Sequence, residues 1–248
     1  MSKFYEMKAY LRNKAGRMGL NLQPKHFGRC AGLLHRFGVE VLFDGGANNG
    51  QFARSMLGGG YKGRIISFEP LSQAFNKLQA NTAGIPEWKA VKIALGDNDG
   101  ECDINISQNS QSSSILAMRD EHVAAAPLSK FIGVEKATVR KLDSVVDEYS
   151  SETDNCFLKL DVQGFEKKVL QGAARSLERC CGIQLEISVQ PLYHGEEKLE
   201  DMLAYVRELG YEPASLSNGF SNPSSQRLLQ IDGIFFRSSL LRELERAA

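Results

Sequence analysis

Short apolar runs alternate with helical patterns along most of the chain. The runs have the length and the β-branched content of buried strands. They lie at 39–43, 64–69, 88–95, 156–161, 182–187, 214–216 and 233–236. Between several of them, apolar residues recur at spacings of three and four, as at Phe75 and Leu78, which is typical of a helix face. Strands and helices that alternate in this way predict an α/β fold with a mostly parallel sheet and right-handed crossovers.

The two ends of the chain depart from this pattern. Residues 1–38 form a predicted N-terminal helical extension, which is locally basic and is interrupted near Pro24. Residues 238–248 form a predicted charged tail helix. The main domain is then expected to span 39–237. A solvated helix face is the favoured interpretation of the basic N-terminal residues, ahead of a membrane-surface or anionic-substrate role.

An internal segment, about 101–140, is interpreted as an insertion with loop and hairpin character. Residues 102–106 alternate between polar and apolar side chains like a strand. Residues 107–114 are rich in Ser, Gln and Asn, which indicates a loop. Long loops in compact domains are either functional lids or mobile segments. The serine-rich stretch is therefore expected either to cover a ligand cleft or to be an ordinary surface loop.

Composition and charge exclude several classes of protein. With 248 residues, 42% of them hydrophobic, the chain suits one large domain with decorations. Because the formal net charge is +0, no nucleic-acid partner is expected. No apolar segment approaches the roughly 18 to 20 residues that span a membrane. The five cysteines include no C-x-x-C pair, which favours reduced thiols and a cytoplasmic location. Assembly into a homo-oligomer stays open.

The stretch 39–52 carries the first functional signal. It reads as a buried strand, then a glycine-dense turn from Asp44 to Gly50, then the start of a helix. In open α/β sheets, ligands bind outside the carboxyl ends of the strands, where such a turn lets the backbone approach them closely. The stretch therefore predicts a ligand site that begins at Asp44.

Three strands deliver a carboxylate to the edge of the sheet where ligands bind. The residues are Asp44, Glu69 and Asp161. Glu69 follows the glycine turn by about the 20 residues at which a carboxylate can accept hydrogen bonds from ribose hydroxyls. The ligand is therefore expected to contain a ribose.

Two ribose-containing cofactors compete for this site, a nicotinamide dinucleotide and S-adenosylmethionine. Ala47 occupies the position at which the dinucleotide pattern has its second glycine, beside the pyrophosphate. Asp44 would repel a diphosphate but suits a cofactor with a sulfonium and an α-amino group. The sequence favours S-adenosylmethionine. An NAD(P)-dependent oxidoreductase and a non-catalytic cofactor-binding module remain as alternatives.

Four blocks in order resemble the signatures of the FkbM-type S-adenosylmethionine-dependent methyltransferases. They are Asp44–Phe52, Phe68–Pro70, Lys141–Ser144 and Leu158–Ala173. The resemblance covers about residues 38–237. It implies a Rossmann-like, seven-stranded class I methyltransferase sheet and methyl transfer to a hydroxyl of a sugar, glycan or natural-product acceptor. Gln163, Phe165 and Gly45 depart from the family pattern, and Gln163 removes a carboxylate from the last block.

The resemblance and the fold analogy together assign the cofactor-binding residues. The turn contributes Asp44, Gly46, Asn48, Gly50 and Phe52. Glu69, followed by Pro70, is assigned to the ribose. The adenine is expected beside Ala94, Leu95 and Asp97. Asp97 also fits a simple role in its Gly-Asp-Asn-Asp-Gly turn.

The catalytic candidates lie after the fourth and fifth strands. A hydroxyl acceptor loses a proton on methylation, and Asp161 is the best-placed base. His194 is the rival base, although a surface histidine is the simpler interpretation. Glu166 and Glu186 could orient the acceptor or hold Mg²⁺, an ion that prefers oxygen ligands. Glu166 could equally stabilise its helix through the helix dipole.

Overall fold

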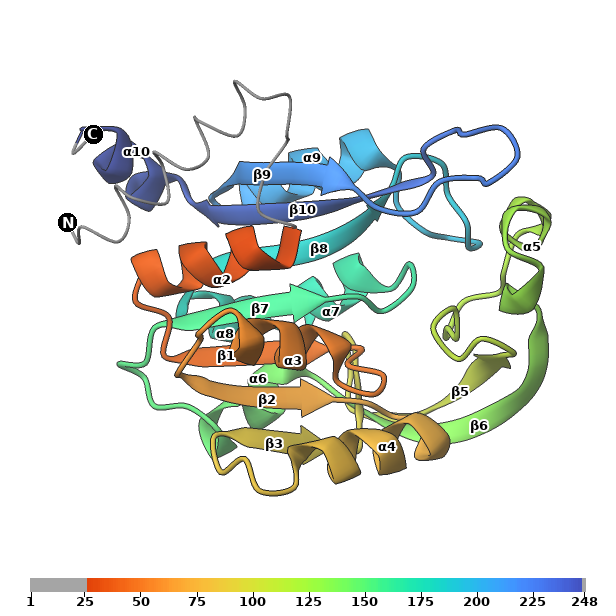
Figure 1. The fold of residues 1–248 in the computed structure, drawn as a ribbon, viewed down its shortest axis with the longest axis horizontal. Coiled ribbons are helices and arrows are strands. Elements are labelled where there is room, and N and C mark those ends of the chain that lie inside the picture. Colours follow the sequence, from red (N-terminus) through yellow and green to blue (C-terminus); the bar gives the residue numbers. More distant parts are fainter. Residues whose placement is uncertain (1–25, 247–248) are drawn as a thin grey trace, which may run out of the picture.

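A seven-stranded sheet forms the centre of the molecule in the computed structural model, which describes residues 26–246 (Figure 1). The strand order is β3-β2-β1-β7-β8-β10-β9. Every pairing is parallel except those of β10, which runs antiparallel to both of its neighbours. These strands are β1 (Val41–Gly45), β2 (Arg64–Phe68), β3 (Trp88–Val91), β7 (Cys156–Leu160), β8 (Cys180–Ser188), β9 (Tyr211–Asn218) and β10 (Gln230–Arg237). The predicted α/β fold is confirmed.

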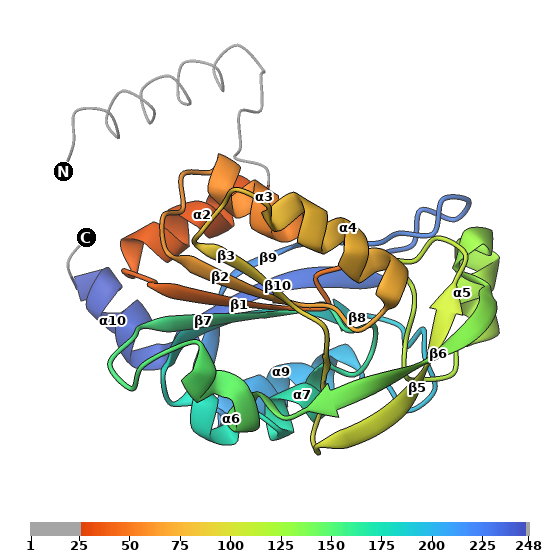
Figure 2. The same cartoon turned by 90° about the horizontal axis from the view of Figure 1, so that it is seen from below.

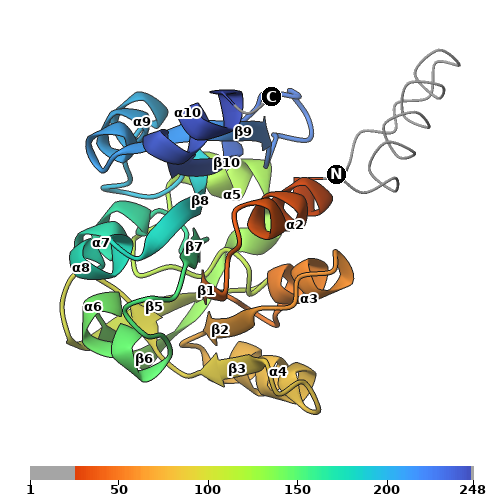
Figure 3. The same ribbon diagram turned by 90° about the vertical axis from the view of Figure 1, so that its left-hand side faces the viewer.

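Helices cover both faces of this sheet (Figures 2 and 3). One face has α2 (His26–Arg36), α3 (Gln51–Gly58) and α4 (Ser72–Thr82). The other has α6 (Leu142–Val145) with its continuation η2 (Val146–Glu148), α7 (Glu166–Gln171), α8 (Ala174–Leu177) and α9 (Leu199–Glu208). Because both faces are covered, the central strands need continuous apolar runs, and β1 and β7 are buried at every position.

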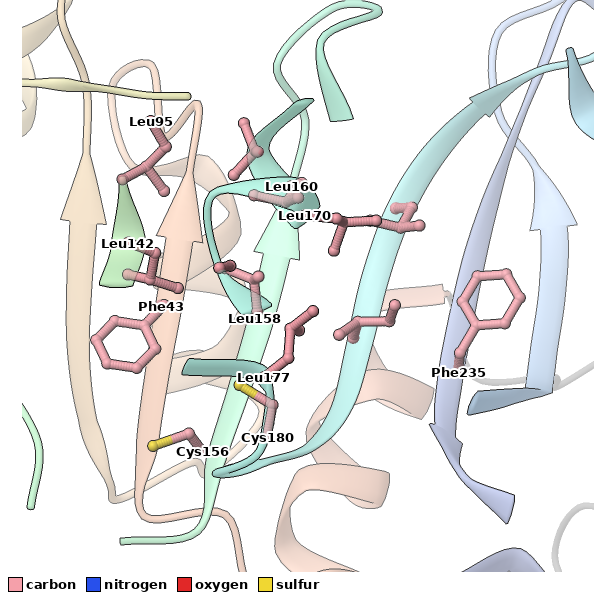
Figure 4. Packing of buried hydrophobic residues seen from close by; sticks show 14 of the residues in the cluster. Phe43, Leu95, Leu142, Cys156, Leu158, Leu160, Leu170, Leu177, Cys180 and Phe235 are labelled. Carbon is pink, nitrogen blue, oxygen red and sulfur yellow. The ribbon is translucent and has the colours of Figure 1, made fainter. Parts of the chain in front are cut away.

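Apolar side chains fill the space between the sheet and its helices. On the α7 side, Phe43, Leu158 and Leu170 belong to one buried cluster, and Figure 4 shows how side chains from strands and helices meet in it. A second cluster on the α3 side includes Leu42, Met56 and Trp88. The sheet is therefore a rigid support for the residues at its strand ends.

A second, three-stranded sheet lies beyond the ends to which the parallel strands point (Figure 1). Its order is β4-β6-β5. The strands are β4 (Ala94–Leu95), β5 (Gly100–Ser107) and β6 (Phe131–Arg140), and α5 (Asp120–Ala125) and η1 (Pro127–Ser129) connect the last two. This is the predicted insertion. Its strand at 102–106 is confirmed within β5, whereas β6 was not predicted.

The prediction of one strand over 88–95 was wrong. The chain pairs with β2 only as far as Val91, where a tight turn forms, with the amide of Ile93 donating to the carbonyl of Val91 at 3.1 Å. Ala94 and Leu95 then pair with β6 in the smaller sheet. The apolar run continues through the turn because Ile93, Ala94 and Leu95 all face the interior cavity described below.

The two ends of the chain are only partly described. Residues 1–25, including most of the predicted N-terminal extension, and 247–248 lie outside the described residues. Of the predicted end helices, α2 and α10 (Ser238–Arg246) are present. Between residues 26 and 246 no helix has both the length and the apolar character needed to cross a bilayer.

Candidate cofactor and acceptor site

A cavity of about 480 Å³ opens at the carboxyl ends of β1, β2, β7 and β8. The turn after β1 and the chain after β2 line one part of it, and polar side chains of β7, β8 and β10 line another. The serine-rich stretch closes it, since residues 109–115 all lie on its wall. This placement favours the cleft-covering interpretation of the stretch over that of an ordinary surface loop. The position is the one at which open α/β sheets bind ligands.

The turn after β1 depends on glycine at position 46. Gly46 has a φ of +71°, and a Cβ on it would lie 1.9 Å from the carbonyl oxygen of Asp161. The amides of Gly46 and Ala47 both donate to the carbonyl of Phe68, at 3.1 and 3.0 Å. Backbone from β1, β2 and β7 therefore converges here, which only a residue without a side chain permits.

Glu69 is buried at the cavity wall, with 5% of its surface exposed. Its Oε2 accepts from the amide of Asn48 at 2.8 Å and its Oε1 from the amide of Leu71 at 2.9 Å. Burial raises the pKa of this carboxyl to about 7, against the opposing effect of the two amides. Each oxygen has a second lone pair for a ligand hydroxyl. The geometry thus fits the predicted ribose contact.

Lys159 is a cavity residue to which the sequence analysis gave no role. It is 5% exposed and is the only cationic side chain on the cavity wall formed by the described residues. Its Nζ lies 3.1 Å from Oδ1 of Asp44 and 3.7 Å from Oδ2 of Asp161. It also donates to the carbonyl of Gly46 at 3.3 Å. The sequence could have indicated this residue, because a charged side chain inside the apolar run of β7 is unusual.

Asp44 lies behind the cavity wall. It is fully buried and is not among the lining residues. Burial raises the pKa of its carboxyl, and Lys159 opposes that effect. The hydroxyl of Ser67 donates to its Oδ2 at 3.1 Å. Asp44 therefore holds Lys159 in place, and a direct contact with a cofactor stays a prediction.

A hydrogen-bonded network connects Asp161 to the second part of the cavity. Gln163 donates through Nε2 to Oδ1 of Asp161 at 2.8 Å and to Oε2 of Glu186 at 2.9 Å. The hydroxyl of Tyr193 donates to Oε1 of Gln163 at 2.7 Å. Gln230 also donates to Glu186, at 2.9 Å. Burial, with Asp161 nearby, raises the pKa of Glu186 well above its ordinary value. The Asp161 side chain is 41% exposed and accessible from the cavity.

Two of the predicted catalytic residues do not line the cavity. Glu166 is 3% exposed, and its Oε1 accepts from the amide of Val162 at 2.9 Å, so it shapes the turn after β7. Burial raises its pKa to about 8. His194 is exposed to solvent. The exposed position agrees with the simpler interpretation of this histidine, and neither residue reaches the cavity wall.

The predicted cofactor-binding residues also include some that line the cavity and some that do not. Lining the cavity are Gly46, Asn48, Phe52, Glu69, Pro70, Ala94 and Leu95. Behind the wall lie Asp44 and Gly50, and Gly50 faces Trp88, whose ring a Cβ would meet at 2.4 Å. Asp97 forms an ion pair of 3.0 Å with Lys168 away from the cavity. The individual roles of all ten residues stay predictions.

Within residues 26–246, no group of three or more His, Cys, Asp or Glu side chains is arranged to hold a metal ion. Gln163 stands between Asp161 and Glu186 and donates to both, so an uncharged amide already occupies the space between these carboxyl groups. The Mg²⁺ option therefore finds no support in the described part of the chain.

The sheet order, the glycine turn and the buried glutamate after β2 define a class I methyltransferase with a Rossmann-like fold. The chain belongs to the FkbM methyltransferase family, because the profile of the Methyltransferase FkbM domain matches residues 44–213. It is thus an S-adenosylmethionine-dependent methyltransferase, as its sequence predicted.

Among curated proteins, the chain is similar to the 2-O-methyltransferase NoeI of Sinorhizobium fredii (strain NBRC 101917 / NGR234). The two are 27% identical over 169 residues, which cover 66% of this chain and 69% of NoeI. Among solved structures, an rRNA methylase from Streptococcus thermophilus has a TM-score of 0.48 and 11% identity, covering 87% of this chain and 98% of that one. Magnesium protoporphyrin IX methyltransferase from Synechocystis PCC 6803 has a TM-score of 0.46 and 9% identity, covering 86% and 78%.

Proposed function

We propose that this protein transfers the methyl group of S-adenosylmethionine to a hydroxyl of a sugar, a glycan or a related natural product. The observation that carries the proposal is the division of one cavity into two unlike parts. The glycine turn and Glu69 form a part that suits a nucleoside, and amides and carboxylates of β7, β8 and β10 form the other. The similarity to a 2-O-methyltransferase supports an oxygen acceptor.

The fit of the cofactor rests on residues of the first part. Gly46 lets the turn pack against the backbone of Asp161, since a Cβ there would collide with the Asp161 carbonyl, and so brings the turn to the cavity wall. Glu69 offers carboxylate oxygens to ribose hydroxyls, while the apolar Ala94 and Leu95 suit an adenine ring. Lys159 presents a positive charge to a carboxylate of the ligand. When bound, S-adenosylmethionine supplies an electrophilic methyl group.

Asp161 is the proposed base for the acceptor hydroxyl. Its carboxylate is held by Gln163 on one side and attracted by Lys159 on the other, so its position is fixed before the acceptor binds. Holding the acceptor oxygen in line with the methyl group supplies much of the rate in a displacement of this kind. Removal of the hydroxyl proton by a positioned carboxylate typically contributes a further factor of about 10² to 10⁴.

Two measurements test the proposal. Calorimetry with S-adenosylmethionine, S-adenosylhomocysteine and NADH should give heat with the first two, and binding of NADH alone would overturn the proposed function. Radiolabelled methyl transfer to a panel of methyl hexosides then tests the acceptor class.

Asp161→Asn provides the test of the base. We expect the rate of transfer to fall by about 10² or more, with S-adenosylhomocysteine bound as in the wild type. Asp103→Asn, on the exposed side of β5, is the matched control and should change neither quantity. An Asp161→Asn enzyme that retains full turnover would remove Asp161 from this role.

A further inference from the structure

His122 brings an imidazole to the cavity from the insertion. It lies on α5, lines the cavity, and is 3% exposed. Its ring packs edge-on against Tyr193, with centroids 5.2 Å apart, and is tilted against Phe220 at 6.0 Å. Phe220, in the connection between β9 and β10, lines the same cavity. Two segments outside the main sheet therefore meet at this end of the site.

One nitrogen of the imidazole has no hydrogen-bond partner among residues 26–246. This atom is Nδ1, which is buried. Tyr193 and Phe220, which the ring contacts, belong to a small apolar cluster, in which a phenyl ring would pack without leaving a buried nitrogen unpaired. Buried polar groups in native proteins are nearly always paired, and each exception calls for an explanation. A ligand that supplies the missing partner is such an explanation.

The charge state of His122 restricts the ligand. Burial lowers the pKa of its imidazole to about 4, so the ring is neutral near pH 7. A neutral imidazole has one N–H donor and one acceptor nitrogen, and a hydroxyl group can pair with either. His122 therefore suits an alcohol, which can pair with either nitrogen, better than an anion, which can pair only with the N–H and would be bound more strongly by a cationic ring.

The other charges on the cavity wall also disfavour an anionic ligand. Asp161 and Asp232 line the second part of the cavity, together with Glu186, whose raised pKa favours its uncharged form. The nearest cation, Lys159, contacts Asp44 and Asp161 and is assigned above to the carboxylate of the cofactor. A carboxylate or phosphate on the acceptor would thus meet negative charge without a free positive partner. Gln230 and Gln184 add neutral polar groups that suit hydroxyls. The Oε1 atom of Gln184 is buried and has no hydrogen-bond partner among the described residues.

We propose that His122 and Phe220 form an acceptor-binding subsite that takes a neutral sugar ring, with the imidazole hydrogen-bonded to one of its hydroxyls and Phe220 against its apolar face. The subsite rests on the proposed methyl transfer and specifies its acceptor as an uncharged glycoside. Tyr193 connects the subsite to the transfer site, because its ring packs on His122 while its hydroxyl donates to Gln163, the partner of Asp161.

A matched pair of variants distinguishes a role of His122 in acceptor binding from a purely structural role. His122→Phe keeps an aromatic ring in the apolar cluster but removes both nitrogens, whereas His122→Gln keeps hydrogen-bonding atoms and removes the ring. With a methyl hexoside that the wild type methylates, His122→Phe should raise KM by about 10- to 100-fold and leave kcat within about threefold. His122→Gln should raise KM less. His35→Phe, on the exposed side of α2, is the control and should match the wild type.

A direct measurement on the wild-type protein needs no variant to fold. In protein with ¹⁵N-labelled histidine and bound S-adenosylhomocysteine, methyl hexosides should shift the ring nitrogen signals of His122. The corresponding hexuronates, which add a carboxylate to the same ring, should not.

Three results decide the proposal. An unchanged KM in His122→Phe would overturn it, as would hexuronates that shift the His122 signals as strongly as hexosides do. If the protein bound no S-adenosylhomocysteine, the methyl-transfer proposal would fail, while a hexoside-dependent shift of His122 measured in the unliganded protein would still support the subsite.

Discussion

Replacing Lys159 by methionine should destabilise the protein strongly and in a pH-dependent way. Asp44 is fully buried, and Lys159 is the cation beside it, 3.1 Å away. Methionine keeps the approximate length of the side chain but leaves the carboxylate with only the Ser67 hydroxyl as a hydrogen-bond donor among the described side chains. Breaking one side of a buried ion pair typically costs about 3 to 5 kcal/mol.

Protonation of Asp44 sets an upper limit to this cost. The folded variant can bind a proton on Asp44, and from an ordinary pKa of 3.8 this costs about 4 kcal/mol at pH 7 and about 2 kcal/mol at pH 5.5. The folded state then holds a proton that the unfolded chain has released. The free energy of unfolding of the variant should therefore fall, relative to wild type, as pH rises from 5.5 to 7.

Urea unfolding at both pH values measures the effect. Lys168→Met, which breaks the exposed pair with Asp97, is the control and should cost no more than about 1 kcal/mol at either pH. Asp44→Asn combined with Lys159→Met should recover part of the loss, because no buried charge remains. A Lys159→Met protein within 1 kcal/mol of wild type at pH 7, or one whose loss is the same at both pH values, would refute the reasoning.

Three further predictions concern the cavity. Glu69→Gln places an amide donor against the amide of Asn48 or of Leu71, so S-adenosylhomocysteine should bind at least about 10-fold more weakly by calorimetry. Because the pKa of Glu69 is about 7, wild-type affinity should fall from pH 8 to pH 6 as the carboxylate gains a proton, and an equal fall in the variant would contradict this cause. Gly46→Ala should cost more than about 3 kcal/mol in urea unfolding, whereas Gly38→Ala, with a φ of +64° but open space around it, should cost only about 1 kcal/mol; equal losses would exclude the collision with Asp161. Gln163→Glu places a third carboxylate between Asp161 and Glu186, so its thermal midpoint should fall further below wild type at pH 8 than at pH 5.5, and the opposite trend would disprove the repulsion.

The sequence predicted the fold, and it brought Gly46 and Glu69 to the strand ends where the cavity opens, because both depend on local patterns. The strand, turn and helix around Gly46 follow from apolar periodicity and glycine spacing, and Glu69 from its distance along the chain. The sequence missed β6 because only Ala137 and Val139 of its residues are buried, so the alternation of buried and exposed side chains is confined to the last part of the strand. The turn at Ile93 was missed because its apolar residues line a cavity that only the tertiary structure creates.

The other half of the cavity, which we propose binds the acceptor, was harder to predict because it depends on contacts between distant segments. In the sequence, Lys159 only interrupts an apolar strand. Its ion pair with Asp44 is visible only in the three-dimensional structure. His122 lies in a polar insertion, 71 residues before its ring partner Tyr193 in the chain, and no spacing indicates that they meet. In contrast, Glu166 and His194 stood close in sequence to the strand ends, but their side chains do not reach the cavity.

The serine-rich stretch connects the two halves of the cavity. At one end, Nδ2 of Asn48 in the glycine turn donates to the carbonyl of Ser110 at 3.3 Å. At the other, the hydroxyl of Ser114 donates to the carbonyl of Gln163 at 2.7 Å. One short piece of chain thus contacts both the glycine turn, to which we assign the cofactor, and the Gln163 network, to which we assign the acceptor. We expect the two ligands to be thermodynamically coupled, so that each changes the affinity of the other by the same factor.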